Sequence, residues 1–123
     1  MRRLAFSIFL GAAFALGLLA TPAWAALSQL ERETVSQDAE VAGQAKFCKM
    51  NWRPLYRAVI ANWRESGRAE ADVEEVDRIF REVMDAQAEL LEPNFCAMGQ
   101  IQVNYSMERA LRSHGVDPST AGY

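Results

Sequence analysis

Two cysteines, Cys48 and Cys96, enclose the most strongly patterned part of this chain. The residues between them form two segments of helical periodicity and contain no catalytic motif. Neither a C-x-x-C sequence nor a metal-ligand spacing is present, and two cysteines in an oxidising compartment are most often paired. The sequence therefore predicts a structural disulfide at the base of a helical hairpin. Closing a loop of roughly 48 residues would stabilise the fold by about 4 kcal/mol in the chain-entropy description.

The first 25 residues have the pattern of a secretory signal peptide. Arg2 and Arg3 give a positive start, residues 4–20 are almost wholly apolar, and Ala23 and Ala25 supply the small residues of a signal-peptidase site. We therefore expect cleavage after Ala25. The alternative is an uncleaved membrane anchor, but an apolar run of about 16 residues is short for a helix that crosses a bilayer.

Removal of the signal peptide would make the chain more acidic. Without the two arginines of the signal, 11 of the 13 basic residues remain against 16 acidic residues, a net charge of −5. Such a domain is a poor general partner for nucleic acid or anionic lipid, and no further apolar stretch is long enough to cross a membrane. We expect an exported protein, periplasmic or secreted, without stable membrane insertion after signal removal.

The clearest helical segment starts at Asn51, an expected N-cap, and ends before Gly67. Pro54 is compatible with this helix because it falls in the first turn, where backbone N–H groups have no helical partner. The apolar positions follow spacings of three and four residues, and they are Trp52, Leu55, Tyr56, Val59, Ile60 and Trp63. This pattern predicts an amphipathic helix with three aromatic side chains on the face that meets the core.

A second helix is expected over residues 70–92, with a heptad-like apolar seam. It lies in an acidic stretch, since residues 65–92 contain ten acidic residues, whereas residues 46–64 contain five basic residues and no acidic one. We expect the basic helix and the acidic helix to pack as an antiparallel hairpin, with complementary charges along their flanks.

A third helix, over residues 94–113, carries two apolar stripes. Val103 and Met107 share a face with Cys96, and the second stripe consists of Met98, Ile101 and Tyr105. Two stripes predict that this helix is covered on more than one side. Gly99 costs helix stability relative to alanine, so we expect another helix to approach closely there.

The segment 26–45 is the least clearly patterned part of the mature chain. Its thin apolar stripe is interrupted by polar residues and by Gly43, and consists of Leu27, Leu30, Thr34, Val41 and Ala45. One frayed helix and two short helices both fit this pattern, and we expect the segment to lean on the core rather than form it. A single all-α domain would then span residues 26–115, followed by a flexible C-terminal tail, residues 116–123.

The best candidate for a partner surface lies on the helix that starts at Asn51. Trp and Tyr beside Arg are the residues that binding surfaces favour, although the same aromatic side chains lie on the expected core face. The set consists of Trp52, Arg53, Tyr56, Arg57 and Trp63. We expect its occupant to be a protein partner or a small ligand, whose identity the sequence leaves open together with the oligomeric state.

Catalytic and metal chemistry have few candidate residues. His114 is the only histidine, and its position beside the helix-ending Gly115 predicts a capping or solvent-facing role at the helix dipole. A haem held by His114 and a methionine is the alternative, but C-x-x-C-H is absent, and zinc and triad chemistry lack the residues they need. The acidic residues between 65 and 92 are expected to form a solvated face, with a cation or a basic partner as the alternative. We expect neither catalytic activity nor a cofactor.

These features predict an all-α fold, a small disulfide-stapled bundle of about four helices built on an antiparallel helical hairpin. The expected function is that of a small exported, non-enzymatic binding or protein-interaction module. The layout of a signal peptide, about 100 helical residues and one disulfide across a long central segment resembles that of the small acid-activated periplasmic chaperones. This architectural resemblance implies an alternative function, an acid-stress chaperone that exposes its aromatic face when its carboxylates are neutralised below about pH 3.

Overall fold

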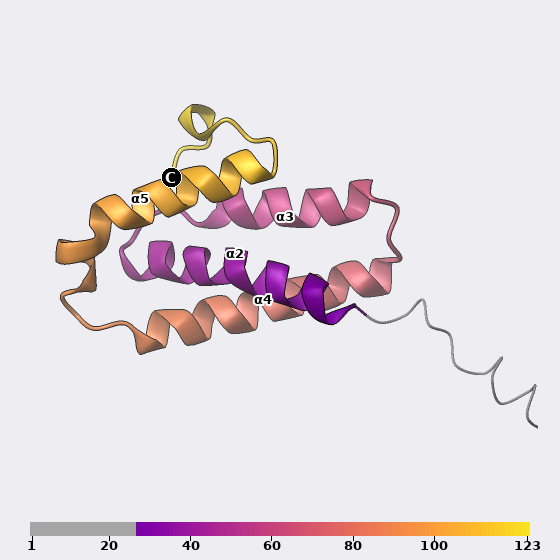
Figure 1. Ribbon diagram of the computed structural model, residues 1–123, viewed down its shortest axis with the longest axis horizontal. Helices are drawn as coiled ribbons and strands as arrows, with labels where there is room; N and C mark the ends of the chain where they lie inside the picture. Colours follow the sequence, from indigo (N-terminus) through magenta and orange to yellow (C-terminus); the bar gives the residue numbers. More distant parts are fainter. Residues whose placement is uncertain (1–26) are drawn as a thin grey trace, which may run out of the picture.

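The computed structural model describes residues 27–123, which form an all-α fold of four α-helices and one short 3₁₀ helix. The elements are α2 (Gln29–Phe47), α3 (Arg53–Glu65), α4 (Glu70–Leu90), α5 (Phe95–Ser113) and the 3₁₀ helix η2 (Pro118–Thr120). Successive α-helices run in opposite directions, so α2 and α4 point one way and α3 and α5 the other (Figure 1). The predicted fold class is confirmed. The predicted signal peptide, residues 1–25, lies outside the described residues.

Helix α2 is one continuous helix that contributes directly to the core. It begins at a capping box, in which the Ser28 hydroxyl accepts from the Glu31 N–H and the Glu31 carboxylate accepts from the Ser28 N–H. Helix α4 is the main packing neighbour of α2. The buried residues of α2 are Val35, Ala39, Ala42, Gly43 and Ala45. The expectation that this segment only leans on the core is therefore wrong.

The small size of these buried residues explains the close packing of α2 on α4. A Cβ atom at Gly43 would lie 2.6 Å from the Met84 carbonyl oxygen and 2.7 Å from Gln87 Cβ, so the two backbones leave no space for a side chain there. Leu30, which belongs to the predicted apolar stripe, is instead 72% exposed. Alanine and glycine contribute little to a hydrophobic pattern, and the buried face of α2 was for that reason hard to recognise.

Helices α3 and α4 form the predicted hairpin, joined by a short turn (Figure 1). Gly67, with φ of 76°, adopts the left-handed conformation that ends α3. The N-cap of α3 is Trp52 rather than the expected Asn51. The side chain of Asn51 still serves this helix end, because its carboxamide oxygen accepts a hydrogen bond from the Arg53 N–H at 3.2 Å.

The charge complementarity predicted between α3 and α4 is mostly not found. Within the described residues a single ion pair links them, from Arg64 to Glu70 at 3.5 Å. Other carboxylates of α4 pair with Arg32 and Lys46 of α2, at 3.0 and 2.7 Å, or with arginines of α4 itself. Most of the paired carboxylates of α4 are therefore bound by α2 or by arginines of α4 itself, and of the arginines of α3 only Arg64 has an ion pair with α4.

The disulfide ties α2 to α5 at one end of the bundle. Cys48 is the C-cap of α2 and Cys96 lies in the first turn of α5. Their Sγ atoms are 2.10 Å apart and their Cα atoms 5.4 Å apart. Gly99, one turn further along α5, does not mark the expected close approach of another helix, since an added Cβ would first meet the ring of Phe95 in the same helix, at 3.3 Å.

The core lies among all four helices, and its largest fully buried side chains include Phe80, Leu55, Met107 and Leu111. Residues 116–123 turn back over α5, and the Asn51 carboxamide nitrogen donates to the Gly122 carbonyl oxygen at 3.2 Å. Val116, Ala121 and Tyr123 of this tail pack against the core. Among the described helices, none combines the length and the apolar character that a bilayer span requires.

Candidate functional site

The outer face of α3 carries three arginines, Arg53, Arg57 and Arg64, here called the arginine row. They fall within about 40° of one another around the helix axis, and all three are exposed. Arg64 pairs with Glu70 across the turn, but Arg53 and Arg57 have no ion pair within the described residues. The other arginines between residues 27 and 90 each contact a carboxylate, and they are Arg32, Arg68, Arg78 and Arg81.

The three aromatic side chains of the predicted partner surface are partly buried, and each lies beneath a guanidinium group. The pairs are Arg53 over Trp52 at 4.9 Å, Arg81 over Tyr56 at 4.8 Å and Arg68 over Trp63 at 4.9 Å, measured to the ring centroids. Such cation–π contacts hold both partners in place. Only the first pair belongs to the arginine row; the other two use arginines that also bind carboxylates.

Tyr56 serves the contact between α3 and α4. Its ring packs edge-on against Trp52 and Phe80, with centroid separations of 6.0 and 5.4 Å. Its hydroxyl bonds to the Asp77 carboxylate, and Arg81 donates both to that hydroxyl at 3.2 Å and to Asp77 at 3.0 Å. The hydrogen bonds that Arg81 donates, the one to Tyr56 first and then the one to Asp77, raise the pKa of Arg81. Of the predicted partner surface, the part that points outward therefore consists of Arg53 and Arg57, with the partly buried Trp52 beside them.

Trp63 borders an open hollow of about 350 Å³, lined by Glu31, Asn62, Trp63, Ser66 and Arg68. Arg68 binds Glu31 and, at 3.1 Å, Asp72. The hydrogen bond to Glu31 raises the pKa of Arg68. The pKa of Glu31 is lowered, first by the hydrogen bond from the Ser28 N–H and second by the hydrogen bond from Arg68. Asp72 is only 3% exposed, so this member of the predicted solvated acidic face is buried. The charged groups of the hollow are thus paired with one another.

His114 joins three helices. It is the C-cap of α5, its Nε2 lies 2.7 Å from the Asp38 carboxylate of α2, and its Nδ1 lies 2.6 Å from the Asn62 carboxamide nitrogen of α3. The geometry fits a ring that donates from Nε2 to Asp38 and accepts at Nδ1 from Asn62. The predicted capping position at the end of the helix is confirmed, whereas the side chain, only 15% exposed, does not face solvent. A haem or metal at either nitrogen would have to displace one of these partners, and within residues 27–123 no three metal-ligating side chains cluster.

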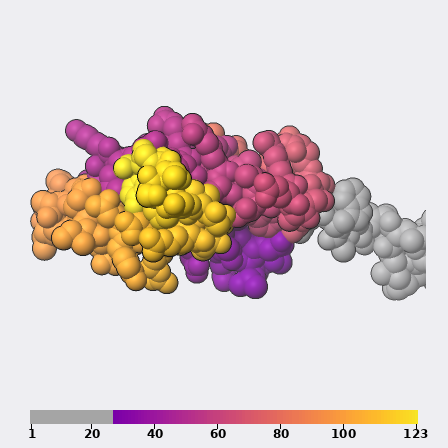
Figure 2. All heavy atoms as spheres, turned by 90° about the horizontal axis from the view of Figure 1, so that it is seen from above, coloured from indigo at the N-terminus to yellow at the C-terminus, as the bar shows by residue number. Residues whose placement is uncertain are grey.

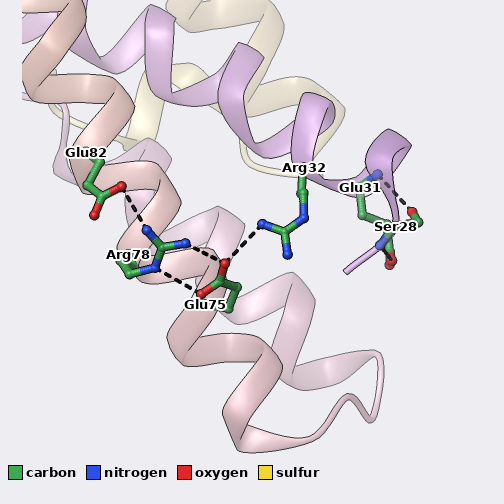
Figure 3. A network of polar contacts seen from close by, with 6 residues as sticks. All are labelled: Ser28, Glu31, Arg32, Glu75, Arg78 and Glu82. Atoms are coloured by element: carbon green, nitrogen blue, oxygen red, sulfur yellow. Dashed lines mark hydrogen bonds and ion pairs between the residues drawn. The ribbon is translucent and has the colours of Figure 1, made fainter. Parts of the chain in front are cut away.

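A cluster of four charged residues clamps α2 to α4 (Figure 3). Glu75 accepts hydrogen bonds from Arg78 at 3.0 and 2.6 Å and from Arg32 at 3.0 Å, and Arg78 also donates to Glu82 at 2.9 Å. The arginines, Arg78 first, lower the pKa of Glu75 from 4.5 to about 2. Because these groups neutralise one another, the clamp offers little uncompensated charge to a ligand.

The outer face of α5 carries three exposed apolar side chains, Met98, Ile101 and Tyr105, here called the α5 stripe. They are 83%, 86% and 55% exposed, and Leu90 at the end of α4 is 77% exposed. The expectation that the bundle covers α5 on more than one side is therefore not met within the described residues. Figure 2 shows the first turns of α5, in orange, at one end of the molecule, with the C-terminal tail, in yellow, lying over the later turns.

The structure thus separates the residues that sequence patterns had grouped. Trp52, Arg53 and Arg57 lie together at the outer start of α3, whereas Tyr56 and Trp63 take part in contacts between elements. The partners of His114 were not foreseen, because Asp38 and Asn62 are separated from it by 76 and 52 residues and share no local motif with it. No known protein-family model matches the chain, and no curated protein or solved structure matches it significantly.

Proposed function

We propose that this protein is a small exported, non-enzymatic protein-interaction module that binds an acidic partner through the outer face of α3. The observation that carries the proposal is the uncompensated pair Arg53 and Arg57 beside Trp52. Like charges at positions i and i+4 of a helix repel each other by a few tenths of a kcal/mol. In a chain with a net charge of −3, acidic groups are abundant, yet none within the described residues reaches these two arginines. Carboxylates of a partner would remove the repulsion.

Arg53 is held in a position that suits carboxylate binding. Its guanidinium lies 4.9 Å from the centroid of the Trp52 ring, which restrains the group while its N–H donors stay accessible at the edge. A planar guanidinium presents two parallel donors that match a carboxylate. Arg57 lies one turn further along the same face, about 5–6 Å away at Cβ. This spacing suits two neighbouring carboxylates of an acidic helix or extended segment.

The non-enzymatic part of the proposal is supported by the state of the reactive side chains. Both ring nitrogens of His114 are engaged by Asn62 and Asp38, and Cys48 and Cys96 are bonded to each other. Histidine and cysteine are the usual general base and the most nucleophilic side chain at neutral pH, and here they have structural partners. Export is supported by the signal-peptide pattern of the first 25 residues.

Site-specific photo-crosslinking in exporting cells tests the proposal. A photoreactive residue in place of Ala61, which is exposed on the outer side of α3 next to the arginine row, should capture a partner that mass spectrometry identifies as acidic at the contact. The substitution Arg57→Glu should lower the capture by on the order of tenfold, because it removes charge-assisted hydrogen bonds worth about 1.5–3 kcal/mol and adds repulsion.

The matched control is Arg112→Glu. Arg112 is likewise an exposed arginine without an ion pair in the described part of the chain, but it lies near the end of α5, and its reversal should leave the capture unchanged. A photoreactive residue at the exposed Glu33 of α2 serves as the positional control. Capture that survives Arg57→Glu, or that yields only basic segments, would contradict the proposal.

The alternative function, an acid-stress chaperone, requires the bundle to open near pH 3. Glu75 keeps a pKa of about 2, so its ion pairs with Arg32 of α2 and Arg78 of α4 would be largely retained at that pH. This weighs against opening. Aggregation of a client protein, followed near pH 7 and near pH 3, separates the two functions. Protection that appears only at the lower pH would favour the chaperone.

A further inference from the structure

The exposed face of α5 differs from the rest of the surface in charge. Residues 93–107 contain no Asp, Glu, Lys or Arg, in a chain in which 24% of the residues are charged. Within this stretch the α5 stripe is exposed to solvent and is flanked by the amide side chains of Gln102 and Asn104. Single exposed apolar residues are common, but an aligned set in a surface depleted of charge is typical of the centre of an interface.

The α5 stripe has the spacing of a helix–helix contact. Its members follow one another at three and four residues, as in the seam of a coiled coil. The stripe lies on the side of α5 opposite Val103 and Met107, which are fully buried in the bundle. A second helix laid along the stripe would bury all three side chains without disturbing the core.

The charges at the two ends of the stripe have opposite signs. Glu92 lies in the loop directly before α5, at the N-terminal end of the stripe, and Arg109 and Arg112 lie in the last turns of α5, at its C-terminal end. All three are exposed, and none has an ion pair within residues 27–123. Glu108 also lies near the C-terminal end, but it lines a polar hollow beneath the C-terminal tail, which Arg112 borders as well. Arg109 stands over the Tyr105 ring, 5.7 Å from its centroid, on the stripe itself.

We propose that a second copy of this chain covers the α5 stripe, with the two α5 helices antiparallel about a twofold axis near Ile101. In this arrangement the acidic end of each stripe meets the basic end of the other, whereas a parallel arrangement would bring like charges together at both ends. Met98 of each copy meets Tyr105 of the other, and a thioether beside an aromatic ring is a favourable contact. The same surface serves both copies, as an isologous dimer requires.

The oligomeric state of the purified chain tests the dimer. Sedimentation equilibrium should give the mass of two copies. The substitution Ile101→Glu should weaken the dimer by on the order of 100-fold or more, because it places two carboxylates at the twofold axis. Leu30→Glu is the matched control, since Leu30 on α2 is also a largely exposed aliphatic side chain, 72% exposed; it should leave the mass unchanged. Far-ultraviolet circular dichroism checks that each variant is folded.

Charge reversal distinguishes the antiparallel arrangement from other contacts. Glu92→Arg and Arg109→Glu should each weaken the dimer by about two- to fivefold, and the two together in one chain should restore it. A monomeric wild-type chain at every concentration measured overturns the proposal, and so does a dimer that is insensitive to Ile101→Glu or is not restored by the double reversal. The result is separate from binding at α3, which Arg57→Glu tests without altering the α5 stripe.

Discussion

At the scale of single residues, the two helical glycines of this bundle have opposite roles. Gly43 lies where α2 and α4 touch, and an added Cβ would meet backbone of the neighbouring helix at 2.6 Å. Gly99 lies near the disulfide, and the atoms that an added Cβ would first meet belong to the Phe95 ring, at 3.3 Å. Both glycines weaken their helices relative to alanine. Only at Gly43 does the close approach of a second helix require a residue without a side chain, and with it this lower helix stability.

The substitution Gly43→Ala should lower the free energy of unfolding by about 1–3 kcal/mol, because the carbonyl of Met84 cannot move without displacing α4. Gly99→Ala is the control, and it should be neutral or stabilising by up to about 1 kcal/mol, since the Phe95 ring can rotate away and alanine favours the helix. Urea unfolding followed by circular dichroism measures both. Equal stability of Gly43→Ala and the wild type would argue against the close contact between α2 and α4.

At the scale of elements, the packing of α2 on α4 determines which charges stay free. Arg32 and Lys46 of α2 form ion pairs with carboxylates of α4. The arginines of α4 form ion pairs with carboxylates of the same helix. Several acidic side chains that were expected to pair with α3 are therefore bound elsewhere. His114 adds a polar contact from α5 to both α2 and α3, so each helix of the bundle is joined to another by polar as well as apolar contacts.

The clamp at Glu75 predicts a pH dependence of stability. Its pKa falls from 4.5 to about 2 on folding, so its contribution is complete above about pH 4.5 and is lost as the pH falls toward 2. Because the side chain is 29% exposed, we expect about 1 kcal/mol or less. The substitution Glu75→Gln should therefore destabilise the fold at neutral pH and have much less effect near pH 2.

Unfolding experiments across this pH range compare Glu75→Gln with Glu74→Gln. Glu74 is exposed and has no ion pair within the described residues, so its substitution should have little effect at any pH. A stability difference between Glu75→Gln and the wild type that stays constant from neutral pH down to pH 2 would show that the carboxylate charge is not responsible.

At the scale of the whole molecule, the disulfide and the core stabilise the bundle in different ways. The bond between Cys48 and Cys96 fastens α2 to α5 at the end of the bundle where two interhelical loops lie (Figure 1). Every α-helix contributes side chains to the core, and the largest fully buried side chain is Phe80 of α4. The bond constrains the unfolded chain, whereas the core favours the folded one by removing apolar surface from water.

The double substitution Cys48→Ser with Cys96→Ser should lower the free energy of unfolding by about 2–4 kcal/mol while leaving the helical content unchanged. The core does not depend on the bond for its contacts, and the loss should appear as a lower midpoint of thermal unfolding. Reduction of the wild-type chain by dithiothreitol is the companion measurement and should give the same shift. A double variant as stable as the oxidised wild type would contradict a stabilising role for the bond.

The helices α3, α4 and α5 and the cysteine pair follow from the sequence by itself. Helical periodicity, the glycine at Gly67 and the proline at Pro93 are local signals, and they place the ends of these helices within a few residues. The pairing of Cys48 with Cys96 follows from there being only two cysteines in a chain expected to be exported. These features depend on near neighbours in the chain or on simple counting.

The tertiary structure decided which helices are neighbours and which side chains are free. The contact of α2 with α4 depends on alanines and a glycine, which carry almost no hydrophobic signal but allow two backbones to approach. Arg53 and Arg57 are unpaired because carboxylates of α4, some 20 residues away, bind basic residues of α2 and arginines of α4 instead. The α5 stripe is exposed because the other helices of the bundle pack against the opposite side of α5. Each outcome is a competition among partners distant in sequence, and only the folded chain resolves it.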